Sequence, residues 1–290
     1  MLEKGIVVEK FPTVKEPTIL IAGFDGWGNA MDVSKTMASY LVRKLKARPF
    51  ATLNADLFYR YDENRPSVLI EDGILKDVIP PGGTFYATRS GPEEKDIIVL
   101  KAQEPNLRWK CFGEELLELS RKLHVQMIIT LGSMYDNVLH SDVIVSGIAS
   151  DEGLSERLRN LDILPINYQG PSAVHSTIQA AAEKAGISCT SLWCHCPYYL
   201  QGATHFGLLS HLGSLVSALA GFDLDTEELD ASWKELNRQI QTLVEKNPEL
   251  QEMITELRKA KVRGSWELMK ESNTQNSKII QLKDFLKPKQ

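Results

Sequence analysis

The fold is decided near the N-terminus by the stretch Thr18-Ile-Leu-Ile-Ala-Gly-Phe-Asp-Gly-Trp-Gly-Asn29. Residues 18–22 form an apolar run that is long enough for a buried strand, and the glycine-rich loop 23–29 ends it. Residues 30–46 then follow the spacing of an amphipathic helix, with apolar side chains at Val33, Met37, Tyr40, Leu41 and Leu45. A strand, a glycine loop and a helix in this order indicate the α/β class.

Further apolar runs of the buried-strand kind occur at residues 96–100, 127–131 and 187–193. Helical patterns at 114–123 and 176–184 alternate with them. Continuous apolar strands separated by helices predict a mostly parallel sheet with helices on both faces. Between residues 54 and 88 the runs are short and are broken by turn residues such as Asp72-Gly73, so we expect a hairpin excursion from the main sheet there.

The C-terminal part carries a different pattern. Apolar residues step by four and three positions through Leu229, Trp233, Leu236, Ile240 and Leu243, which predicts a helix with one apolar face. Asn247-Pro248 is a cap followed by a first-turn proline, so a second helix should start there and complete a helical hairpin. We therefore expect an α/β core domain at 1–222, a helical appendage at 223–264 and a mobile tail at 265–290.

Composition narrows the function classes. The 290 residues are 43% hydrophobic and 24% charged, as in ordinary globular proteins, and the net charge is −5. Nucleic acids and anionic membranes attract basic faces, so we expect neither as a partner. We also expect no membrane-spanning helix and no secretory leader. The four cysteines are few for the length, which is typical of a reducing compartment, and we expect a cytoplasmic protein without cofactors.

The glycine loop is the first candidate ligand site. It lies at the C-terminal end of a predicted strand, where α/β proteins usually bind ligands. Its spacing matches neither a Walker phosphate loop nor the dinucleotide fingerprint, and an aspartate in it would repel a phosphate. The alternative is that the glycines only allow a tight turn and close packing of a helix on the sheet. The candidate ligand-binding residues of the loop are Gly23, Asp25, Gly26, Trp27, Gly28 and Asn29.

Other candidates follow the later strands on the same edge, which we call the rim. Glu104 and His140 join Asp25 as candidate catalytic groups, Arg108 as an anion partner and Tyr168 as a further ligand-binding residue. Each has a structural alternative. Glu104 with the next proline is a common helix start, a single rim histidine is more often a hydrogen-bonding residue, and the glycine–proline pair after Tyr168 is typical of a turn.

A cysteine–histidine cluster at Cys194-His195-Cys196, with His205 further on, has some zinc-ligand character. Zinc sites usually combine a Cys-x2–4-Cys pair with a second matching pair, and this chain has no second cysteine pair. We therefore expect structural roles for these residues and no metal site.

The order of motifs resembles the proteasome assembly chaperone 2 family, in its bacterial and archaeal branch. The resemblance runs from about Pro17 to Leu219. The motifs that carry it are Pro17–Ala30, Arg65-Pro66, Glu104-Pro-x-x-Arg-Trp109, Leu131-Gly132, Tyr168-x-Gly-Pro171, Ser191-Leu-Trp193 and Pro197-x-Tyr199. The family's Pro-His-Thr-Arg-Pro is replaced by Leu139-His-Ser-Asp-Val143, so the role of that arginine is absent here.

The resemblance implies an α/β fold similar to the phosphorylase/hydrolase-like fold, and homo-oligomers, with a trimer favoured. Such sequences are often labelled as an ATP-grasp superfamily, but the magnesium-binding carboxylates and nucleotide lysine expected of that label are missing from the pattern. Eukaryotic relatives act as chaperones of proteasome assembly, whereas the resemblance implies no established reaction.

Two functions follow as hypotheses. The first is an oligomeric, assembly-chaperone-like protein that binds other proteins. The second is a nucleoside phosphorylase- or hydrolase-like enzyme, or a small-ligand-binding protein, whose site is the rim around the glycine loop. A deep pocket that brings the rim residues together would favour the second.

Overall fold

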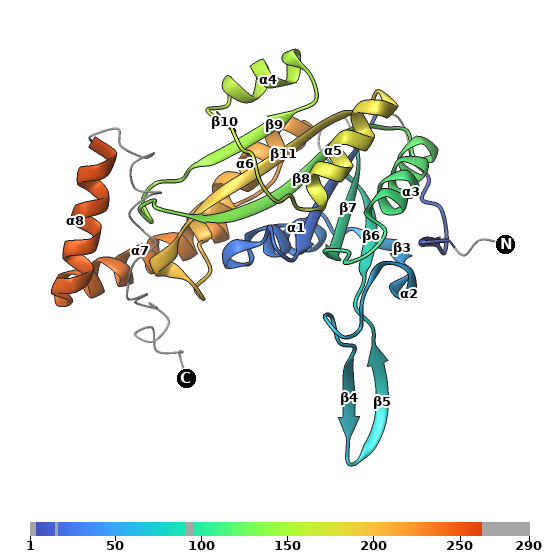
Figure 1. Cartoon of the computed structure of the whole chain (residues 1–290), viewed down its shortest axis with the longest axis horizontal. Helices are drawn as coiled ribbons and strands as arrows, with labels where there is room; N and C mark the ends of the chain where they lie inside the picture. The colour runs from blue at the N-terminus through green and yellow to red at the C-terminus, as the bar shows by residue number, and fades with distance from the viewer. Residues whose placement is uncertain (1–3, 15–16, 91–94, 263–290) are drawn as a thin grey trace.

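The computed structural model describes residues 4–14, 17–90 and 95–262. A nine-stranded sheet in the order β1-β3-β6-β7-β2-β8-β11-β9-β10 forms the centre of the described part (Figure 1). Its strands are β1 (Ile6–Val8), β2 (Thr18–Asp25), β3 (Arg48–Leu53), β6 (Gly83–Ser90), β7 (Lys95–Gln103), β8 (Val125–Asp136), β9 (Val145–Ala149), β10 (Leu164–Pro165) and β11 (Ser188–Pro197). A separate two-stranded sheet consists of β4 (Ser67–Glu71) and β5 (Ile74–Ile79).

The sheet is mixed, so the expectation of a mostly parallel sheet is corrected. The four predicted strand runs became β2, β7, β8 and β11, which are adjacent and parallel to one another. The strands on either side of this block, β6 and β9, run antiparallel to it. Only the central strands are buried on both faces, and these are the strands that read as continuous apolar runs. The outer strands carry no such unbroken apolar run.

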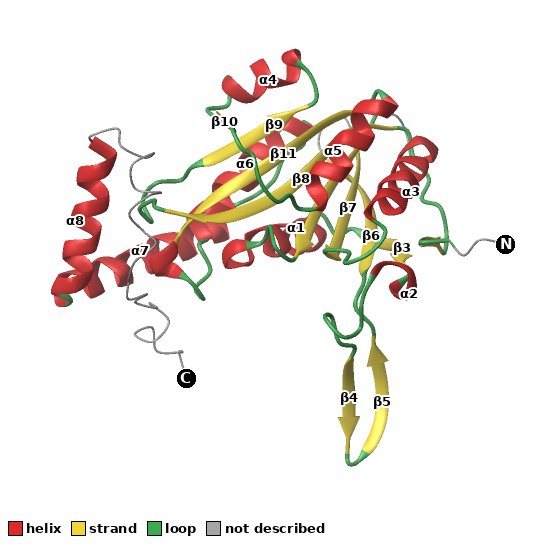
Figure 2. Cartoon of the chain, viewed as in Figure 1, coloured by secondary structure: helices red, strands yellow, loops and turns green. Residues whose placement is uncertain are grey.

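Helices cover the sheet (Figure 2). The helices of the described part are α1 (Val33–Lys44), α2 (Ala55–Phe58), α3 (Trp109–Lys122), α4 (Glu152–Arg159), α5 (Val174–Ala185), α6 (Phe206–Ala220), α7 (Glu227–Lys246) and α8 (Pro248–Val262). Two short 3-10 turns, Ala30–Asp32 and Tyr198–Leu200, complete the described helical structure. None of the described helices is long and apolar enough to cross a bilayer.

The side chains of β2 point alternately to the two faces of the sheet, which explains why the core has two halves. Ile19 and Ile21 pack into a buried cluster with side chains of α1, α6 and α7. Leu20 and Ala22 belong to a second cluster with side chains of α3 and α5. Successive side chains of a strand point to opposite faces, so one apolar strand anchors helices on both sides. The predicted helices on both faces are therefore present.

The C-terminal helices pack onto one of these halves. Leu236 and Ile240 of α7 and Ile254 of α8 are buried in the cluster that contains Ile21. Asn247 caps α8 as expected, because its side-chain oxygen accepts hydrogen bonds from two backbone N–H groups of the first turn. In Figure 1, α8 runs across the direction of α7. The helical hairpin and the domain division at residue 222 stay predictions, and the tail 265–290 lies outside the described residues.

The expected hairpin excursion is narrower than residues 54–88, because β6 belongs to the main sheet. The β4–β5 hairpin projects away from the body of the molecule (Figure 1). Every residue of its two strands is exposed. A two-stranded hairpin on its own is marginally stable in water. This hairpin, which we call the arm, is therefore the element of the described fold that is least stabilised by contacts with the rest of the chain.

Candidate functional site

The glycine loop is held tightly against its surroundings. A Cβ on Gly23 would lie 2.7 Å from the carbonyl oxygen of Ser34 in α1, so only glycine lets the helix approach the strand this closely. A Cβ on Gly28 would lie 3.0 Å from the ring of Trp193. The carbonyl of Gly28 accepts a hydrogen bond from the Ser133 N–H at 2.8 Å. Close packing therefore accounts for these glycines without a ligand.

Asp25 and Asn29 form a compact polar network at the end of β2. The Lys35 ammonium lies 2.6 Å from a carboxylate oxygen of Asp25, and this hydrogen bond raises the pKa of Lys35. The Asn29 amide donates to Asp25 at 3.0 Å and to Asp32 at 3.1 Å. The Lys35 ammonium and the Asn29 amide thus hold the Asp25 carboxylate in place.

Glu104 joins two rim segments that are far apart in the sequence. One carboxylate oxygen accepts the Trp27 N–H at 3.0 Å, and the other accepts the Val174 N–H at 2.8 Å. The first bond fixes the glycine loop and the second fixes the start of α5. A Cβ on Gly26 would lie only 2.5 Å from the Cβ of Glu104, which explains that glycine as well. The geometry makes Glu104 a clamp between loops.

The rim presents aromatic and basic side chains to the outside. Trp27 and Tyr168 are each 63% exposed, although the Tyr168 hydroxyl donates to the Pro171 carbonyl at 2.8 Å. Arg108 is also exposed, and its backbone is left-handed, with φ of 54° at the start of α3. Exposed large aromatics that are held by rigid loops suit contact with another macromolecule.

His140, predicted as a rim residue, makes its contacts away from the glycine loop. Its Nδ1 lies 2.7 Å from the Tyr199 hydroxyl, and its carbonyl oxygen lies 3.1 Å from the Nε2 of His205. The His205 ring in turn stacks on Trp233 of α7 at 4.5 Å. Burial lowers the pKa of His140, and it lowers the pKa of His205 to about 4. The histidine is a buried member of the contact between α6, α7 and the loop after β8.

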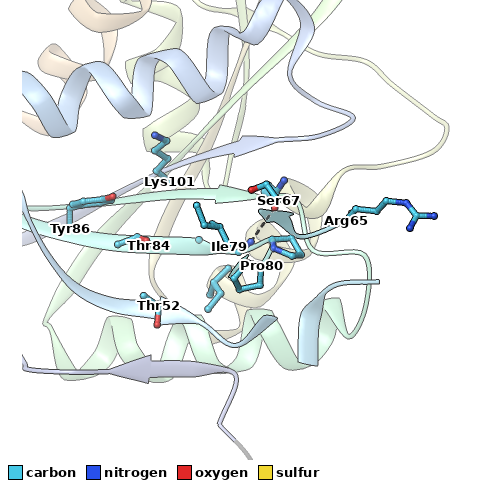
Figure 3. A pocket seen from close by; sticks show the side chains of 13 residues that line it. Thr52, Arg65, Ser67, Ile79, Pro80, Thr84, Tyr86 and Lys101 are labelled. Atoms are coloured by element: carbon cyan, nitrogen blue, oxygen red, sulfur yellow. Dashed lines mark hydrogen bonds between the residues drawn. The ribbon is translucent and has the colours of Figure 1, made fainter. Parts of the chain in front are cut away.

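A cavity of about 570 Å³ lies at the base of the β4–β5 hairpin. None of the predicted rim residues lines it. Its lining comes from β3, β6, β7 and the hairpin base, including Thr52, Ser67, Ile79, Thr84, Tyr86 and Lys101. In Figure 3 the side chain of Arg65 extends away from the other labelled residues. The enzyme hypothesis called for a deep pocket lined by the rim residues, and this cavity does not meet that condition.

The cysteine–histidine cluster is divided between the two faces of β11. Cys194 and Cys196 are buried in the cluster with α1, and burial raises the pKa of the Cys196 thiol to about 12. His195 lies between them and contacts Ser146 and Asp136 instead. Within the described ranges no group of three His, Cys, Asp or Glu side chains is placed to hold a metal ion. Sequence patterns missed the contacts of His195, because its partners lie on two other strands.

Comparison with known families decides the relationship. The model of the PAC2 family matches residues 20–244. The chain belongs to the PAC2 family. The family resemblance noted in the sequence is thereby confirmed, but the ATP-grasp label and the phosphorylase/hydrolase-like comparison are not shown. No curated protein matches the chain.

Solved structures agree with this assignment. A PAC2 family protein from Streptomyces avermitilis is 28% identical with a TM-score of 0.74, and the match covers 82% of this chain and 100% of that chain. A Mycobacterium tuberculosis proteasome-assembly chaperone homologue is 25% identical with a TM-score of 0.75, covering 81% and 99%. A Pyrococcus furiosus archaeal proteasome activator is 20% identical with a TM-score of 0.63, covering 84% and 99%, and shares the fold.

The Glu104 clamp predicts a loss of stability on truncation. Glu104→Ala leaves the N–H groups of Trp27 and Val174 without their carboxylate, which we expect to cost about 2 kcal/mol in the free energy of unfolding. Urea denaturation measures this cost. The matched control is Glu114→Ala on α3, whose carboxylate is 64% exposed and lies 3.9 Å from Lys110. That control should change stability by less than about 0.5 kcal/mol. Equal effects of the two variants would refute the clamp.

Burial of His205 predicts a pH dependence. An unfolded histidine titrates near pH 6.5, whereas the folded pKa is about 4, so protonation favours unfolding. The stability is fully present above about pH 6.5 and falls by about 3 kcal/mol as the pH approaches 4. His205→Asn retains a side chain that can cap α6 but cannot titrate. Its unfolding free energy should fall less steeply over this range in urea titrations, whereas parallel curves would contradict the assignment.

Proposed function

We propose that this PAC2 family protein is a protein-binding, assembly-chaperone-like oligomer, and that the β4–β5 hairpin is the arm that joins its copies. The observation that carries this proposal is the exposure of the arm's apolar side chains. These side chains, each between 48% and 59% exposed, are Val68, Leu69, Ile70, Ile74, Leu75, Val78 and Ile79. An apolar patch of this extent marks an interaction surface in a folded protein.

One face of the arm gathers apolar side chains, and the register leaves Lys76 of β5 without a cross-strand partner. Cross-strand partners share a face, and the register pairs Val68 with Val78 and Ile70 with Leu75. The other face is mixed, because there Leu69 pairs with Asp77 and Glu71 pairs with Ile74. We call the first set, Val68, Ile70, Leu75 and Val78, the apolar face. Its chemistry is that of a sheet face that packs against another apolar surface.

A second copy of the chain is the partner that fits this arm. An open two-stranded sheet with β-branched apolar residues is an aggregation hazard whenever it is uncovered. Another copy is present wherever the protein itself is present, so it can cover the arm at all times. A homo-oligomer of this kind, with a trimer as the preferred form, also agrees with the family resemblance, and we place it in the cytoplasm.

The rim is then free to bind a further protein. Trp27 and Tyr168 are exposed, and Asp25, Asn29 and Glu104 hold the loops that carry or adjoin them. We assign the glycine loop, Arg108 and Tyr168 to this contact. One similar protein is described as a proteasome-assembly chaperone homologue, which supports a protein ligand. Neither the family nor these relatives support the alternative of a phosphorylase- or hydrolase-like enzyme whose site is the glycine loop and its neighbouring residues.

Light scattering coupled to size-exclusion chromatography tests the arm. The wild-type protein should elute as a multiple of the 32.5 kDa chain, with three copies in the preferred form. The variant Val68→Lys/Val78→Glu replaces one cross-strand pair of the apolar face by opposite charges, which can still pair across the hairpin. Burying these charges between copies should cost about 3 kcal/mol, roughly a hundredfold in the association constant.

The matched control is Glu71→Lys, which changes a charge on the mixed face and removes no apolar side chain. It should leave the assembly unchanged. A monomeric wild-type protein at tens of micromolar would overturn the proposal, and so would a Val68→Lys/Val78→Glu variant that keeps the wild-type mass. Circular dichroism would show that each variant retains its fold.

A further inference from the structure

A second cluster of reactive side chains lies at the same edge of the sheet. The Oγ of Ser146 lies 2.8 Å from the Nε2 of His195, and the Nδ1 of His195 lies 2.8 Å from a carboxylate oxygen of Asp136. A carboxylate accepts hydrogen bonds, so the proton of the neutral imidazole belongs on Nδ1. Nε2 is then the acceptor for the Ser146 hydroxyl. These are the atoms and roles of a serine–histidine–aspartate triad.

Three adjacent strands build this cluster. Asp136 is the last residue of β8, His195 lies near the end of the parallel strand β11, and Ser146 lies at the start of β9, which runs antiparallel to β11. All three therefore meet at the edge of the sheet where parallel strands end, the usual position of catalytic groups in α/β proteins. Rigid strands hold every member, which suits a preorganised site.

Exposure increases along the hydrogen-bonded chain. Ser146 is 3% exposed, the His195 side chain is 14% exposed and the Asp136 side chain is 33% exposed. The cluster is thus neither sealed in the core nor spread over the surface. Because Ser146 is the most buried of the three, only a small acyl group is considered as its substrate.

Trp193 adds a polar group without a partner. Its indole Nε1 is buried and makes no hydrogen bond within the described residues. Trp193 is the cross-strand partner of Ser146, so the two side chains share one face of the sheet at neighbouring positions. An unused buried donor costs stability and often reflects a functional role. The indole ring lies over Gly132 of β8 and beside the ring of His175, so this donor takes no part in the step proposed below.

We propose that Ser146, His195 and Asp136 form a nucleophilic serine centre that hydrolyses carboxylic esters with small acyl groups. The Ser146 oxygen bonds to the acyl carbon while His195 takes the hydroxyl proton, and His195 then gives that proton to the departing alcohol. Water attacks the acyl-serine with His195 as its base, which releases the carboxylic acid and restores the serine. Asp136 orients the imidazole throughout. This activity goes beyond the proposed assembly function and uses none of the hairpin residues.

Covalent labelling of the full chain tests the proposal. A fluorophosphonate probe should modify Ser146 with loss of fluoride, and tandem mass spectrometry identifies the modified residue. Ser146→Ala should abolish the labelling, and His195→Gln or Asp136→Asn should slow it by about 10³ to 10⁴. Hydrolysis of p-nitrophenyl acetate should fall in parallel. The control Ser214→Ala, which removes a helix hydroxyl bonded to the Ser210 carbonyl, should label at the wild-type rate.

Three results would overturn the proposal. They are a wild-type protein that neither reacts with the probe nor hydrolyses the ester, labelling at a different residue, and a folded Ser146→Ala protein that labels like wild type. The modified site in the wild-type protein is informative even if a variant fails to fold. Loss of thermal stability in Ser146→Ala, without any reactivity in the wild type, would assign the cluster to strand–strand cohesion alone.

Discussion

The exposed apolar side chains of the β4–β5 arm set the main constraint on this protein, because the fold itself does not cover them. The main sheet covers both of its faces with helices, and β2 alone contributes to two buried clusters. Nothing comparable covers the β4–β5 arm within the described residues, where both strands are exposed along their whole length. A fold that buries its apolar residues so thoroughly elsewhere places this surface outside its own core. In the function proposed above, the arm acquires its stability from a second copy of the chain.

The edge of the sheet at the ends of the parallel strands separates into two regions with different chemistry. Around the glycine loop, the carboxylates of Asp25 and Glu104 are bound by an ammonium, an amide and backbone N–H groups, so they hold loops in position. On the adjacent strand β8, the carboxylate of Asp136 instead supports an imidazole that faces a hydroxyl group. In the two proposals made above, the same edge serves protein binding at one end and ester hydrolysis at the other.

Sequence patterns located the central strands well, because strands buried on both faces read as unbroken apolar runs. They assigned the short run in β6 to a hairpin excursion instead of the main sheet, and they missed the shorter strands β1, β3, β9 and β10, which carry no comparable signal. They placed Glu104 and Asp25 on one edge, and the structure shows Glu104 in contact with the glycine loop. His140 was grouped with them because it follows a parallel strand, but the structure places its ring against Tyr199. The Ser146–His195 contact spans 49 residues of sequence and depends on strand order, which no local pattern encodes.

Hydrogen–deuterium exchange of the β4–β5 amides at several protein concentrations tests the central claim most directly. If copies of the chain cover the arm, its amides should exchange slowly in concentrated protein and progressively faster on dilution, while the amides of β2 and β8 remain equally protected throughout. Hairpin exchange that is fast and independent of concentration would show that the arm stays uncovered and would contradict the account.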